Sequence, residues 1–108
     1  MSNQQLKGHL EALVMAILET GPAHGYSIIE SLRSDSGGLF DLPEGTIYPA
    51  LHRLEDAGLV RSTRELAEGR ERRIYHLVPA GHRSLGKRRV AWQEFSLAVT
   101  SMLAVNPA

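Results

Sequence analysis

The sequence predicts a mainly α-helical protein with a small β-hairpin, in the order helix, helix, helix, strand, strand, helix. Two changes in the spacing of apolar residues predict this order. Apolar residues recur every three or four positions in the first half of the chain, alternate with polar residues between positions 60 and 77, and return to helical spacing after Pro79. This is the order of a winged helix-turn-helix with an added C-terminal helix.

The first two helices are predicted from their apolar stripes. One is expected from Leu6 to Glu19, where Gly21 and Pro22 end it. The other is expected from Tyr26 to Ser36, before a pair of glycines. Residues 22–25 should form the turn between them.

A short connection then leads to the third helix. Residues 39–43 are too few for a helix, and we expect an extended segment that places Leu39 or Phe40 in the core. The helix should begin between Glu44 and Thr46 and end at Gly58.

Pro49 is the local conflict in this third helix, because proline lacks the N–H that a helix interior needs. If Thr46 caps the helix, Pro49 lies in the first turn, where its N–H has no partner to lose. If the helix starts near Glu44, a slight kink is expected at Gly45.

The third helix is also the expected DNA-reading element. Its apolar stripe faces the core, and its polar side presents Thr46, Tyr48, His52 and Arg53. Tyr48 has a second interpretation, as a surface aromatic half-buried against the preceding helix.

The hairpin is predicted from two alternating runs, 60–65 and 72–77, joined by a polar tip at 66–71 that contains glycine. It carries five arginines, Arg61, Arg64, Arg70, Arg72 and Arg73. Because side chains alternate across a strand, about half of them should face DNA. Arg70 and Arg72, nearest the tip, are preferred.

Charge is unevenly distributed along a chain of 108 residues and zero net charge. Residues 1–60 carry three basic and eight acidic side chains, residues 61–89 carry nine basic and three acidic, and residues 90–108 carry only Glu94. The positive segment is thus the hairpin and the helix start after it. Clustered arginine beside a reading helix is typical of phosphate contacts with DNA.

Several functional classes are disfavoured by composition. The chain has no cysteine, which excludes disulfides and thiolate metal sites. The five histidines have no metal-ligand spacing, and no catalytic motif, P-loop or dinucleotide fingerprint is present. No segment is typical of a signal peptide or membrane span. We therefore expect a cytoplasmic protein that is not an enzyme and has no metal or cofactor.

The last helix is expected to begin near Pro79 and Ala80 and to form a dimer. Large residues repeat at heptad spacing on one seam: Leu85, Trp92 and Val99, with Arg88, Phe95 and Met102 in the companion positions. No further chain remains to cover them, so a second copy should do so. We expect residues 1–78 to form the DNA-binding part and residues 79–108 the dimerisation helix, within one compact unit.

A set of motifs resembles the PadR family of bacterial transcriptional regulators. They are Leu6-Lys7-Gly8, the run from Gly21 to Tyr26, the run from Gly45 to Glu55, Gly58-Leu59-Val60, and the run from Gly69 to Leu77. The single C-terminal helix is similar to the short subfamily. The resemblance implies a dimeric repressor that leaves double-stranded DNA when a small hydrophobic or phenolic compound binds. A homodimer would present two reading helices to a palindromic operator. Members usually carry threonine where this chain has Val78, so a helix cap worth about 1 kcal/mol is missing.

The expected DNA-binding residues combine the reading helix, the start of the second helix and the hairpin: Tyr26, Gly45, Thr46, Tyr48, Pro49, His52, Arg53, Arg64, Arg70, Arg72 and Arg73. The expected dimerisation residues are Leu10, Leu13, Leu85, Trp92, Phe95, Val99 and Met102.

Two questions stay open at this point. Trp92 either stacks a flat aromatic ligand across the dimer axis or only packs the dimer core. A winged helix can also serve protein contacts alone, although the basic hairpin argues against that alternative.

Overall fold

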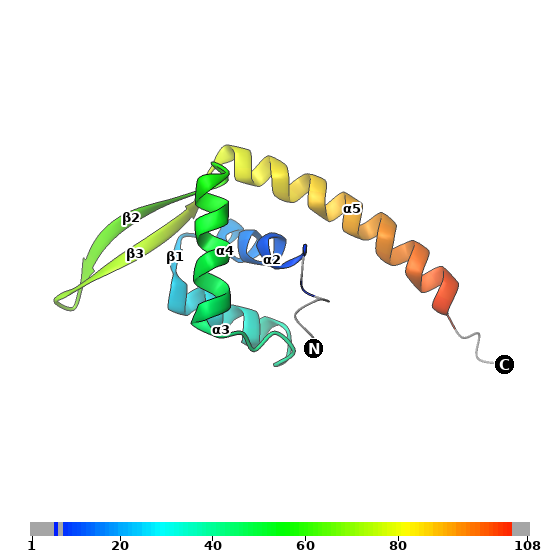
Figure 1. Cartoon of the computed structure of the whole chain (residues 1–108), viewed down its shortest axis with the longest axis horizontal. Helices are drawn as coiled ribbons and strands as arrows, with labels where there is room; N and C mark the ends of the chain where they lie inside the picture. Colours follow the sequence, from blue (N-terminus) through cyan, green and yellow to red (C-terminus); the bar gives the residue numbers. More distant parts are fainter. Residues whose placement is uncertain (1–5, 7, 105–108) are drawn as a thin grey trace.

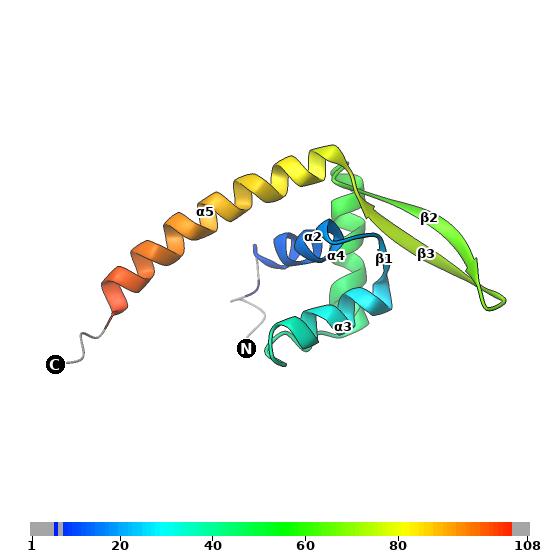
Figure 2. The ribbon, with the colours of Figure 1, turned by 180° about the vertical axis from the view of Figure 1, so that it is seen from behind.

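The computed structural model of the chain describes residue 6 and residues 8–104. Its elements are α2 (Leu10–Glu19), β1 (Ala23–His24), α3 (Gly25–Asp35), α4 (Glu44–Asp56), β2 (Val60–Ala67), β3 (Arg70–Leu77) and α5 (Pro79–Leu103). Helices α2, α3 and α4 form a central body. The β2–β3 hairpin, called the wing below, and α5 leave that body in opposite directions (Figures 1 and 2). The molecule is therefore elongated, with extents of 61 × 28 × 22 Å.

The core lies where α2, α3 and α4 meet. Its fully buried side chains come from the predicted stripes of these helices, including Val14, Ile28 and Ile47. Tyr75 of β3 and Leu85 of α5 extend the same core toward the wing and the last helix. The winged helix-turn-helix prediction is confirmed by this arrangement.

The first predicted helix is interrupted near its start. Leu6 is helical, as the sequence analysis predicted, but the chain turns at Gly8, which has φ +90°, and at His9, so α2 begins only at Leu10. The N–H of His9 donates to the Leu6 carbonyl at 2.8 Å. Lys7 lies outside the described residues.

A third strand was missed. Residues 22–25 were expected to be a turn, yet Ala23 pairs with Tyr75 and His24 with Ile74. The sheet order is β1-β3-β2, so the start of α3 is attached directly to the wing. His24 is also the N-cap of α3, since its Nδ1 accepts from the Ser27 N–H at 3.4 Å.

Helix α4, which the sequence analysis predicted to read DNA, starts at Glu44, the earlier of the two predicted positions, and Pro43 precedes it in an extended conformation. Pro49 is therefore the sixth residue of the helix. At the other end, the Leu59 N–H donates to the Leu54 carbonyl, and Gly58 has φ +74°. This left-handed glycine closes the helix as predicted.

Of the two residues predicted to place the connection before α4 in the core, one does so. Phe40 is partly buried and packs against the core, whereas Leu39 is 59% exposed.

The wing is longer and its turn tighter than predicted. Both strands have eight residues, and they pair from Val60 with Leu77 to Ala67 with Arg70. Only Glu68 and Gly69 remain as the turn, with φ values of 52° and 75°. Two successive positive φ values are typical of the tight turns whose twist matches a β-hairpin.

Helix α5 is continuous from Pro79 to Leu103 and starts without a side-chain cap at Val78, as predicted. Gly81 is buried where α5 crosses the end of α4, against the carbonyl of Leu59. A side chain at Gly81 would collide with that backbone atom, so the glycine fixes how closely α5 approaches the body.

Candidate DNA-binding site

The outermost strip of α4 consists of Gly45, Pro49 and His52, at the i, i+4 and i+7 spacing of one helix face. All three are exposed. Tyr48 and Thr46 lie on the two flanks of this strip and are partly buried. The exposed face predicted for the reading helix is thus present.

Arg53 is not on the same flank as Tyr48. The two residues are five positions apart, which is about 140° around a helix. On its own flank, the Arg53 Nε donates to Oε1 of Glu11 on α2 at 2.7 Å. The sequence analysis placed Tyr48, His52 and Arg53 on the polar side of the helix, and all three lie off its buried stripe, with Arg53 exposed on the flank opposite Tyr48. A DNA contact by Arg53 stays a prediction.

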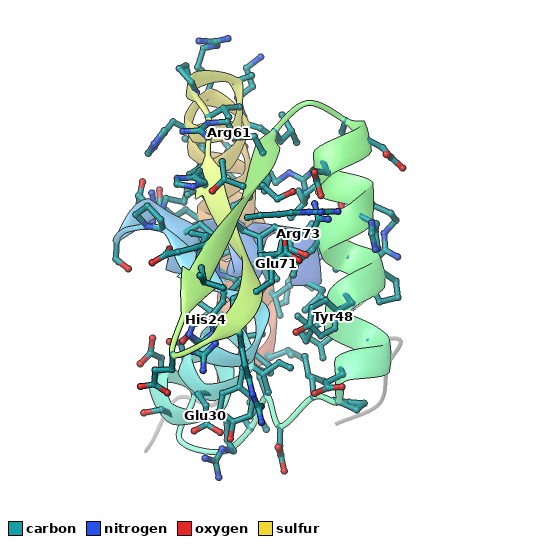
Figure 3. All side chains as sticks on the ribbon, turned by 90° about the vertical axis from the view of Figure 1, so that its left-hand side faces the viewer. His24, Glu30, Tyr48, Arg61, Glu71 and Arg73 are labelled. Atoms are coloured by element: carbon teal, nitrogen blue, oxygen red, sulfur yellow. The ribbon has the colours of Figure 1, made fainter. Side chains whose placement is uncertain are left out.

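A cleft of about 490 Å³ separates α4 from the base of the wing, called the α4 cleft below. Its lining combines aromatic, basic and acidic residues: Tyr48, His52, Glu55, Asp56, Arg73 and Tyr75. Figure 3 shows Arg73 extending from the wing toward α4, with Tyr48 lower on the same helix. Two carboxylates beside one guanidinium disfavour a phosphate in this cleft, whereas the amino group of a base can donate to a carboxylate.

Arg73 is held in place by a chain of hydrogen bonds. Its Nη1 donates to the Ser62 hydroxyl at 2.9 Å, and that hydroxyl donates to Oε2 of Glu55 at 2.8 Å. These hydrogen bonds connect β3, β2 and α4, and so join the base of the wing to α4. Sequence reasoning missed Ser62 and Glu55, because the contact between them depends on how the wing folds back.

A second cleft, of about 360 Å³, lies between the start of α3, α4 and the wing, and is called the α3 cleft below. Its lining residues are His24, Gly25, Tyr26, Tyr48, Glu71, Arg72, Arg73 and Tyr75. Nη1 of Arg72 is 3.4 Å from Nε2 of His24, and Tyr26 is 61% exposed. Two arginines face one carboxylate here, so the α3 cleft suits a phosphate better than the α4 cleft does.

Tyr75 lines both clefts, although the sequence analysis did not select it. The side chain is 2% exposed, and this burial raises the pKa of its hydroxyl above the ordinary tyrosine value, while Arg73 opposes the shift. The hydroxyl therefore remains protonated and able to donate a hydrogen bond. Its position in the strand, after three arginines, one glutamate and Ile74, did not single it out as a site residue.

The remaining arginines of the wing differ in their environment. Arg70 is exposed beside the turn, and Nη1 of Arg64 is 3.5 Å from Oε1 of Glu71. Arg61 lies at the opposite end of the wing, near the start of α5 (Figure 3). The preference for Arg70 and Arg72 over Arg61 as DNA contacts agrees with these positions, and remains a prediction.

Comparisons with known proteins bear on this interface. The sequence model of the family described as "Transcriptional regulator PadR-like family" matches residues 14–87. The chain belongs to this family. A transcriptional regulator from Mycobacterium tuberculosis is 46% identical over 55 residues, which make up 51% of this chain and 51% of that protein. The matched part thus spans about half the length of that relative.

Solved structures give the same assignment. A PadR family transcriptional regulator from Eggerthella lenta is 30% identical, with a TM-score of 0.76 over 95% of this chain and 91% of its own. A transcriptional regulator from Clostridium thermocellum shares the fold at 23% identity, with a TM-score of 0.87 over 94% of this chain and 99% of its own. As a PadR-like regulator, the protein belongs to a class that acts on transcription by binding DNA.

Both clefts of this PadR-like chain lie within the matched residues, whereas the aromatic part of α5 follows them. That part borders an apolar groove of about 720 Å³ between α2 and α5. Trp92 is 51% exposed on one wall, 5.2 Å from the ring of His9 and 6.1 Å from that of Phe95. Leu13 and Phe40 line the groove from the body, and Arg88 and Arg89 lie at its edge.

The predicted dimerisation residues fall into two groups. Leu10 and Leu85 are buried in the core of the protomer, and Leu13 packs against it. The other four lie farther along α5, where Val99 is partly buried and Trp92, Phe95 and Met102 are exposed. The second group is the more exposed of the two, while Leu13 of the first group also lines the apolar groove.

An ion pair holds α5 on α2. Both terminal nitrogens of Arg89 donate to the Glu19 carboxylate, at 2.7 and 2.9 Å. The hydrogen bond from Arg89 lowers the pKa of Glu19 below its ordinary value, and the same bond raises the pKa of Arg89.

Within the residues that the structure describes, no helix is long and apolar enough to cross a membrane. Nor do three histidine, aspartate or glutamate side chains gather there as a candidate metal site.

Proposed function

We propose that the protein is a cytoplasmic homodimeric repressor that binds a palindromic operator and releases it when a small, flat aromatic compound binds. The observation that carries this proposal is the row of exposed aromatic and aliphatic residues on α5 beside the apolar groove. A helix face of this size is normally covered in a soluble protein, and a second copy related by a twofold axis offers a self-complementary cover.

DNA contact divides between the two clefts and the wing. Gly45, Pro49 and His52, with Tyr48 on their flank, enter the major groove, since they form the outermost surface of α4. Phosphates are held by the arginines and tyrosine around the α3 cleft and along the wing: Tyr26, Arg64, Arg70, Arg72 and Arg73. Thr46 and Arg53 lie on the other flank of α4, where the Glu11 carboxylate competes with DNA for the Arg53 guanidinium.

The dimer arises through residues 79–108, with residues 1–78 as the DNA-binding part. The partner covers Trp92, Phe95, Val99 and Met102, while Leu10, Leu13 and Leu85 support this surface from beneath. Such a dimer presents two reading helices to half-sites about 34 Å apart.

Release follows from the position of Trp92. Its indole borders both the groove and the proposed dimer seam, so a flat aromatic compound stacked on it alters how the two copies meet. A compound that favours one spacing of the reading helices over another shifts the dimer away from its operator.

The decisive experiment selects bound sequences from a pool of random DNA duplexes. The proposal expects an enriched palindrome with half-sites one helical turn apart, and a dimer in sedimentation at the same protein concentration. Enrichment of a single unpaired half-site would contradict the dimer. Failure to enrich any sequence would favour a winged helix used for protein contacts.

A further inference from the structure

Gly25 is buried at the first position of α3, and its backbone does not explain why it is glycine. Its φ is outside the positive range in which side chains are strained, unlike Gly8, Gly58 and Gly69. Any residue can adopt this conformation. The reason for a glycine therefore has to lie in the space around it.

That space is filled by one side chain. A Cβ placed on Gly25 would lie 2.6 Å from both Cε1 and Oη of Tyr48 and 2.7 Å from its Cζ. Carbon atoms in contact are normally about 3.5 to 4 Å apart, so the Tyr48 ring and a methyl group on residue 25 cannot both occupy these positions. The Tyr48 ring thus occupies the place that a side chain on α3 would take.

The position of this ring matters, because Tyr48 is the wall shared by the two clefts. Its hydroxyl end is the part that approaches Gly25. This brings the hydroxyl to the start of α3, in the cleft that Arg72 also lines. An outward shift of the ring would move the hydroxyl out of this cleft and narrow the space beside His52.

We propose that Gly25 is a positioning residue for DNA recognition: its missing side chain lets Tyr48 lie against α3, which places the Tyr48 hydroxyl in the α3 cleft as a donor to a DNA phosphate. The inference rests on the proposed DNA-binding face. It adds that a residue which touches no DNA itself determines affinity through the orientation of Tyr48.

The test is a double-mutant cycle with Gly25→Ala, Tyr48→Ala and the pair. The probe is a fluorescein-labelled duplex that carries the sequence the wild type enriches, with binding measured by anisotropy well below each variant's melting midpoint. We expect Gly25→Ala and Tyr48→Ala each to weaken binding by about tenfold, which is the effect of one hydrogen bond to a charged group. With alanine at position 48 the added methyl group has room, so the pair should bind like Tyr48→Ala alone.

Gly86→Ala is the matched control, because Gly86 is also helical but has open space where a Cβ would be. It should bind as the wild type does. Tyr48→Phe gives an independent measurement, since the ring keeps its place and only the hydroxyl is lost. We expect it to weaken binding by about tenfold as well.

Three results would overturn the inference. Wild-type affinity in Gly25→Ala would show that the ring position is irrelevant, and an equal loss in the Tyr48→Ala background would show that Gly25 acts through another contact. If Gly25→Ala is unfolded at the assay temperature, wild-type affinity in Tyr48→Phe overturns the inference instead. A wild type that enriches no duplex overturns the proposed function as well, which separates the two failures.

Discussion

Arg53 and Glu11 join the reading helix to the helix that lines the apolar groove. The Arg53 Nε donates to one oxygen of Glu11 at 2.7 Å, and the other oxygen lies 3.8 Å from Nη1 of Arg88 on α5. One carboxylate on α2 is therefore shared by α4 and by the helix that carries Trp92. A DNA phosphate that engages Arg53 has to compete with this carboxylate.

Glu11→Gln is expected to strengthen DNA binding. The amide keeps the size of the side chain but removes the charge that competes for Arg53, which is 57% exposed in its side chain. Since exposed ion pairs contribute about 0.2 to 1 kcal/mol, affinity should rise by up to about fivefold. Anisotropy titrations of the enriched duplex at low salt would measure this change.

Glu19→Gln is the matched control for Glu11, because Glu19 is on the same helix and also pairs with an arginine of α5, but not with α4. It should leave DNA affinity unchanged. The gain in Glu11→Gln should also vanish in an Arg53→Ala background. An equal gain with and without Arg53 would mean that the effect is only one of net charge.

Arg72→Ala is expected to weaken binding to all DNA sequences alike. Arg72 lines the α3 cleft, where a phosphate rather than a base is expected. Losing one phosphate contact lowers the slope of log affinity against log salt by about one unit. Arg61→Ala, on the same hairpin but at the end near α5, is the control and should change the slope less. Equal slopes for the wild type and Arg72→Ala would exclude this contact.

Val78→Thr is expected to stabilise the protein. Val78 has φ −92° and ψ 168°, the extended conformation of a capping residue, but its side chain makes no hydrogen bond to the first turn of α5. A threonine hydroxyl can accept from those amides and should add about 1 kcal/mol to the free energy of unfolding. Thermal denaturation would show a midpoint about 4 °C higher. If Val78→Ala gave the same increase, capping would not be the cause.

Trp92→Ala is expected to weaken the dimer by at least about tenfold, as truncation of a buried aromatic at an interface centre does. Leu97→Ala is the control, because Leu97 is also exposed but about 140° around α5 from Trp92. Sedimentation equilibrium would measure both dissociation constants. Similar constants for the two variants would remove Trp92 from the proposed interface.

Most of the fold could be predicted from apolar spacing, because each long helix buries one stripe. The exceptions depend on single residues or on distant partners. Gly8 interrupts a stripe that continues past it, so periodicity predicted one unbroken helix from Leu6 where the chain turns before α2 begins at Leu10. Strand β1 has two residues and exists only because Tyr75 and Ile74 lie beside it.

The sequence predicted which face of α4 is exposed, but not which side chains contact one another around it. Helical spacing shows that Arg53 points away from the core, but the contact with Glu11 joins residues 42 positions apart. The role of Gly25 was hidden for a similar reason. Its sequence neighbourhood indicates a turn, and only the packing of α3 on α4 brings Tyr48 onto it.

Because the molecule is elongated, a small tilt about the far end of α5 produces a large displacement of the wing. The two elements extend from opposite sides of a body that is rigidly packed, over a total length of 61 Å (Figure 1). A tilt of about 5° around the far end of α5 moves the wing by about 5 Å, which exceeds the rise of about 3.4 Å between neighbouring base pairs. If the wing binds DNA as proposed, such a tilt would be enough to shift it by more than one base-pair step.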